Sequence, residues 1–109
     1  MPRADWAYDF VCGQSIETIL DAFNSSGPWR WEMRDRLHWG DYLRCRPKQG
    51  ATIDVLKYPK RRGAREKRFK ALLEIQVENP AAQSEIDDAF RRLLQAINAT
   101  DVIEAKPYN

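Results

Sequence analysis

Residues 69–97 read FKALLEIQVENPAAQSEIDDAFRRLLQAI, and this stretch decides the fold. Its first ten residues largely alternate between apolar and polar side chains, which predicts a long strand with one face on a core. Asn79 and Pro80 follow as a helix cap and a first helical residue. An apolar stripe then predicts an amphipathic helix. Its members are Ile86, Ala89, Phe90, Leu93, Leu94 and Ile97.

The rest of the chain repeats these patterns in shorter form. Alternation predicts strands over residues 6–12 and 29–37, and two shorter strands are predicted over residues 42–46 and 51–58. Turns are predicted over residues 38–41 and 47–50, between the last three of these strands. Ser15 is placed to cap a helix that begins at residue 16, and residues 102–105 are predicted to add a short edge strand, able to pair with another copy. The order predicts a two-layer α+β sandwich, with two helices on one face of a mostly antiparallel sheet. It resembles a ferredoxin-like plait, or a β-α-β-β-β-β-α variant of one.

Composition indicates one α+β domain over residues 1–109, since 43% of the residues are hydrophobic and 31% are charged. No apolar run approaches the length of a membrane helix, and the start lacks the apolar region of a signal peptide. Cys12 and Cys45 are too few for a disulfide framework. We therefore expect a cytoplasmic protein with reduced thiols and no membrane partner, and the oligomeric state stays open.

Charge is unevenly spread along the chain. Lys57 to Lys70 holds eight basic residues and one acidic residue, whereas the rest holds ten basic and fifteen acidic residues. The middle of this basic segment is predicted to be a hairpin loop at about residues 58–67, with Pro59 interrupting the strand and Gly63 at the tip. This uneven distribution of charge is evidence about the partners that the protein binds and not about its fold.

The leading functional hypothesis is a non-enzymatic interaction module that binds an acidic protein or another anion through this loop. A solvated loop that only protects a sheet edge is an equal alternative. A second functional hypothesis is a nucleic-acid-binding accessory protein. It would bind through the same loop and two arginines of the sheet, with Tyr58 and Phe69 as groups on which bases stack. The candidate binding residues are Lys60, Arg61, Arg62, Arg65, Lys67, Arg68, Arg44 and Arg46.

Small-molecule binding is a third hypothesis, in which large rings on the first two strands line a pocket. These rings are more typical of a core, and they are Trp6, Tyr8, Phe10, Trp29 and Trp31. Catalysis is not expected, because His38 is the only histidine and no set of nucleophile, base or metal ligands stands out. The sequence likewise predicts no cofactor.

Overall fold

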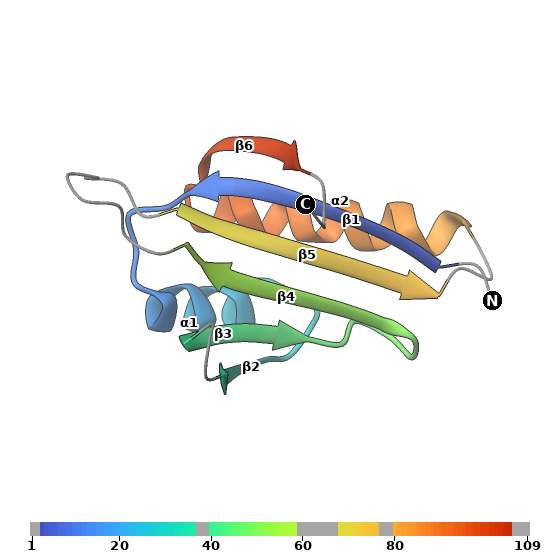
Figure 1. Ribbon diagram of the computed structural model, residues 1–109, viewed down its shortest axis with the longest axis horizontal. Coiled ribbons are helices and arrows are strands. Elements are labelled where there is room, and N and C mark those ends of the chain that lie inside the picture. The colour runs from blue at the N-terminus through green and yellow to red at the C-terminus, as the bar shows by residue number, and fades with distance from the viewer. Residues whose placement is uncertain (1–2, 37–39, 59–67, 77–79, 106–109) are drawn as a thin grey trace.

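The computed structural model describes residues 3–36, 40–58, 68–76 and 80–105 (Figure 1). Within them the chain forms six strands and two helices, in the expected order. They are β1 (Arg3–Val11), α1 (Ile16–Ser26), β2 (Trp31–Arg36), β3 (Gly40–Cys45), β4 (Ala51–Lys57), β5 (Arg68–Gln76), α2 (Pro80–Ala96) and β6 (Thr100–Ala105).

All six strands join one antiparallel sheet in the order β2-β3-β4-β5-β1-β6, and both helices lie on the same face of it (Figure 1). The expected α+β fold with an antiparallel sheet and two helices is confirmed. The ferredoxin-like topology is not, because this strand order differs. Two crossovers produce the order: α1 carries the chain from β1 to the far edge at β2, and α2 returns it from β5 to the open side of β1.

The core lies between the sheet and the helices. One row across the sheet shows how the alternation works, since Met33, Leu43, Val55, Ala71 and Tyr8 are successive neighbours on five strands. All five belong to the core cluster or pack against it. Burying each large apolar side chain stabilises the fold by roughly 1.5–3 kcal/mol. The apolar faces of the helices complete the core with Ile16, Ile19, Phe23, Ile86, Phe90, Leu93 and Leu94, and Ile97 directly after α2 also belongs to it.

The aromatic stripe is part of this core. Tyr8, Phe10 and Trp31 are buried, and Trp6 and Trp29 are partly buried against them. The rings pack on helix side chains: Phe23 contacts Trp31 with centroids 4.8 Å apart, and Phe90 stacks near Tyr8. The interpretation of these rings as core is confirmed.

Local signals fixed several element ends. The Ser15 hydroxyl accepts a hydrogen bond from the Thr18 amide at 3.2 Å, so it caps α1 as expected. The turn expected over residues 47–50 is present, with Gly50 at a φ of +80°. The turn expected over residues 38–41 is wrong at its end, because Gly40 and Asp41 begin β3 and pair with β2. Trp39 and His38 lie outside the described residues.

Candidate functional site

The basic segment leaves the sheet between β4 and β5. Of the cations of the segment that the structure describes, Lys57 and Arg68 are exposed and Lys70 is half-buried. The Tyr58 amide donates to the Arg68 carbonyl oxygen at 2.9 Å, so the two strands stay paired up to that point. Five candidate residues of the segment lie outside the described residues. They are Lys60, Arg61, Arg62, Arg65 and Lys67.

The two aromatic residues near the ends of the segment, Tyr58 and Phe69, make contacts within the fold. Phe69 is fully buried and stacks on Phe10 with ring centroids 5.4 Å apart. The Tyr58 hydroxyl reaches across β5 and donates to Asp9 Oδ1 at 2.8 Å. Burial raises the pKa of Tyr58 to about 12, and the hydrogen bond and charge of Asp9 add to the effect. The expectation that Phe69 could stack on a base is therefore wrong, and Tyr58 is held against β1.

Arg44 lies on the face of the sheet that carries no helix, where it pairs with Asp54 on β4. Its Nε and Nη2 atoms donate to the two carboxylate oxygens at 2.7 Å and 2.9 Å. The two side chains are only 18% and 12% exposed, and the guanidinium also lies 5.6 Å from the centroid of the Tyr42 ring. The hydrogen bonds to Asp54 raise the pKa of Arg44 above its ordinary value. An external anion would have to displace Asp54 to bind this arginine.

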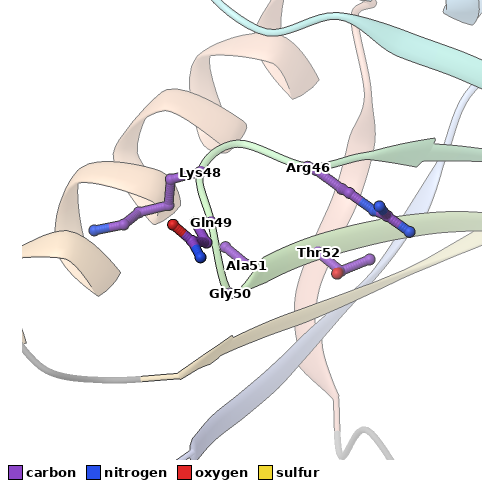
Figure 2. A pocket seen from close by; sticks show the side chains of 6 residues that line it. All are labelled: Arg46, Lys48, Gln49, Gly50, Ala51 and Thr52. Carbon is purple, nitrogen blue, oxygen red and sulfur yellow. The ribbon is translucent and has the colours of Figure 1, made fainter.

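Arg46 lines a shallow hollow of about 510 Å³ at the turn between β3 and β4. Figure 2 shows Arg46 and Thr52 pointing to one side of this turn, whereas Lys48 points to the other. The two cations therefore diverge and do not converge on one ligand. Gln49, Gly50 and Ala51 complete the lining.

Arg46 and Arg68 lie at opposite ends of the sheet. Cys45 is paired with Ile53 near the start of β4, whereas Lys57 at its end is paired with Phe69. β4 has seven residues, so roughly 20 Å of strand separates the two positions. The structure does not bring Arg44 and Arg46 together with Arg68.

A polar cluster that the sequence did not reveal joins α2 to β1. Trp6 Nε1 donates to Asp87 Oδ1 at 2.9 Å, and the Tyr8 hydroxyl donates to the same oxygen. Arg91 Nε donates to Asp87 Oδ2 at 3.0 Å, and its Nη2 donates to the Tyr8 hydroxyl oxygen at 3.0 Å. The available signal was the placement of Trp6 and Tyr8 on the core-facing side of β1, where a buried N–H or O–H needs a partner.

The titration of this cluster argues for a structural role. Burial raises the pKa of Tyr8 to about 12, with the hydrogen bond to Asp87 and its charge acting in the same direction. Burial alone would raise the pKa of Asp87, but hydrogen bonds from Tyr8, Arg91 and Trp6 outweigh it and hold that pKa below its ordinary value. Near pH 7 the tyrosine stays neutral and the aspartate stays charged. The pair therefore lacks a group poised for proton transfer at that pH.

Both cysteines are core residues. Each is 1% exposed, and Cys12 Sγ donates to the Ile97 carbonyl oxygen at 3.5 Å. Burial raises the pKa of the Cys45 thiol to about 12, which suppresses the thiolate that a nucleophile requires. Within the described ranges, no group of three or more His, Cys, Asp or Glu side chains could hold a metal ion.

The described helices are too short or too polar to cross a membrane. No protein-family model matches the sequence, and no curated protein matches it.

Proposed function

We propose that this chain is a cytoplasmic, non-enzymatic interaction module that binds an acidic protein surface through the basic segment Lys57–Lys70. The observation that carries the proposal is the segregation of charge: the segment has eight basic residues and one acidic residue, and the rest of the chain has an acidic excess. A patch of one sign steers an oppositely charged partner and raises its association rate.

Ion pairs within the described part of the chain support this choice of segment. Arg44 pairs with Asp54, Arg91 with Asp87, and Arg34 with Glu32. These arginines are already compensated by neighbouring carboxylates. The basic segment, in contrast, contains only Glu66 to offset its eight cations. By sequence, the segment therefore carries a large net positive charge of its own.

The aromatic residues favour an acidic protein over single-stranded nucleic acid. Proteins that bind single strands stack bases on exposed rings. Every aromatic side chain among the described residues is buried or half-buried, and Phe69, near the end of the segment, is fully buried. Charge alone would then have to supply the binding, which suits a carboxylate-rich surface.

Charge reversal in the segment tests the proposal. The variant carries Lys60→Glu, Arg61→Glu, Arg62→Glu and Arg65→Glu. Its matched control makes the same change in net charge at four exposed positions on the described body, Arg30→Glu, Arg34→Glu, Lys48→Glu and Arg92→Glu. Binding to a labelled poly-L-glutamate peptide is followed by fluorescence anisotropy over a salt series, and circular dichroism checks that each protein is folded.

The segment variant should bind the peptide roughly tenfold or more weakly than the parent, while the control keeps most of the affinity. Equal losses in both variants would mean that net charge alone governs binding and would overturn the proposal. So would a segment variant that binds as well as the parent. A labelled DNA oligonucleotide is measured in parallel, and segment-dependent binding of DNA without binding of poly-L-glutamate would replace the acidic protein with nucleic acid.

A further inference from the structure

Two exposed cations of the basic segment, Lys57 at the end of β4 and Arg68 at the start of β5, lie on opposite faces of the sheet. Lys57 is paired with Phe69, whose ring is fully buried in the core, so the Lys57 side chain lies on the helix-covered face. Arg68 directly precedes Phe69 and therefore lies on the helix-free face, because successive side chains of a strand alternate. A partner that binds the segment can extend onto either face of the sheet.

The helix-free face is basic where it meets the segment. The Tyr58 hydroxyl reaches Asp9 Oδ1 on this face at 2.8 Å, and Lys70 is the direct cross-strand neighbour of Asp9. Burial raises the pKa of Tyr58, and the charge of Arg68 acts in the opposite direction because its guanidinium lies near the phenol. Two cations therefore accompany one carboxylate here, and that carboxylate already accepts the hydroxyl of Tyr58.

The helix-covered face is acidic at the same end of the sheet. β1 ends at Val11, which is paired with Arg68, and the chain then enters α1 (Figure 1). Glu17 and Asp21 are exposed on successive turns of α1. One cation, Lys57, therefore accompanies two carboxylates on this side. An acidic surface that approached from the helix-covered side would meet like charge, which disfavours association.

Aliphatic side chains lie beside the cations on the helix-free face. Leu56 is paired with Lys70, and Val11 is paired with Arg68. Both aliphatic side chains are half-buried, and both described helices lie on the opposite face of the sheet. Protein interfaces commonly combine apolar contacts with a charged rim. The helix-free face therefore offers a partner protein both kinds of contact next to the segment.

We propose that the acidic partner covers the helix-free corner of the sheet, formed by Val11, Leu56, Tyr58, Arg68 and Lys70, and does not extend onto the helix-covered side. Partner carboxylates contact Arg68 and Lys70, and apolar partner side chains contact Val11 and Leu56. This placement rests on the proposed function, because it takes the basic segment as the binding site for an acidic protein. It adds the face of the sheet that the partner covers.

Arg68→Glu and Lys57→Glu compare the two faces. Both variants make the same change in charge at an exposed residue, in the same segment and at the same end of the sheet. Arg68→Glu should weaken binding to labelled poly-L-glutamate roughly fivefold or more, whereas Lys57→Glu should weaken it less than about twofold. Fluorescence anisotropy at low salt measures both, and circular dichroism checks that each is folded. Equal losses, or a larger loss for Lys57→Glu, overturn the placement.

A nitroxide label on the peptide maps the covered face without any substitution in the protein. It should broaden the methyl NMR signals of Val11 and Leu56 more strongly than those of Thr18 and Ala96, which are exposed on α1 and α2. Equal or stronger broadening at Thr18 and Ala96 overturns the placement.

The placement and the proposed function fail in different ways. If the fourfold segment variant loses binding while Arg68→Glu and Lys57→Glu bind alike, the segment is the site and the choice of face is wrong. If the fourfold variant binds as well as the parent, the segment is not the site, and the proposed function and the placement are both wrong.

Discussion

Asp87 is the shared acceptor of the polar cluster that joins α2 to β1. It accepts hydrogen bonds from Trp6, Tyr8 and Arg91. Asp87→Ala should lower the free energy of unfolding by about 1–3 kcal/mol, because it leaves the buried Tyr8 hydroxyl without its acceptor. Asp88→Ala, at the adjacent exposed position, is the control and should change it by less than about 0.5 kcal/mol. Urea denaturation measures both, and equal effects would contradict the role given to Asp87.

The two tyrosines with raised pKa values make stability depend on alkaline pH. The pKa values of Tyr8 and Tyr58 rise from 10.0 to about 12 on folding, mainly through burial. The native state then holds these protons to higher pH than the unfolded state does, so stability should fall as pH rises from 10.0 to about 12. Tyr58→Phe should make that fall shallower in denaturation measured across this range. An unchanged slope would show that Tyr58 titrates normally.

Arg44 and Asp54 should be energetically coupled, unlike an exposed pair on the same sheet. Their side chains are 18% and 12% exposed, whereas those of Arg34 and Glu32 are 40% and 63% exposed. A double-mutant cycle to alanine should give a coupling of about 1–3 kcal/mol for Arg44 and Asp54, because removing one partner strands a poorly hydrated charge. The Arg34 and Glu32 cycle should give about 0–1 kcal/mol. Similar couplings in both would mean that burial does not strengthen the first pair.

At the scale of elements, the packing of α1 on α2 requires a glycine at residue 27. A Cβ atom there would lie 2.5 Å from Leu93 Cδ2, and Leu93 is buried. Gly27→Ala should destabilise the protein by about 1–3 kcal/mol through this overpacking. Gly13→Ala is the matched control, since a Cβ at residue 13 meets nothing within 4 Å, and it should be neutral or slightly stabilising. Thermal or urea denaturation compares the two, and a neutral Gly27→Ala would show that the helices can separate freely.

At the scale of the whole molecule, both thiols should be protected until the core opens. Cys12 and Cys45 are each 1% exposed and lie on the core side of the sheet. A thiol reagent should modify both cysteines only as fast as the protein unfolds, because both lie in one hydrophobic cluster. Ser84→Cys, at an exposed position on α2, should react at once and serves as the control. Rapid modification of the native cysteines in the parent would show that the cluster opens locally.

The elements themselves followed from local patterns in the sequence. Alternation of period two placed β1, β2 and β5, and the apolar stripes placed α1 and α2, because these periodicities reflect which side chains meet the core. Ser15 as a cap and residues 47–50 as a turn were also predictable, since each depends on neighbours in the chain. Within the candidate site, the sequence alone determined the charge asymmetry of Lys57–Lys70.

Only the tertiary structure decided which of these residues meet. Strand order set Arg44 beside Asp54 and put Arg46 and Arg68 at opposite ends of β4, because an antiparallel meander reverses direction at every turn. Asp87 reaches Tyr8 across a sequence separation of 79 residues, a contact that depends on where α2 lands on the sheet. The same placement put Val102 and Ile103 on the edge strand β6, where both are exposed among the described residues. Periodicity records the environment of a side chain but not the identity of its neighbours, which packing of distant segments alone determines.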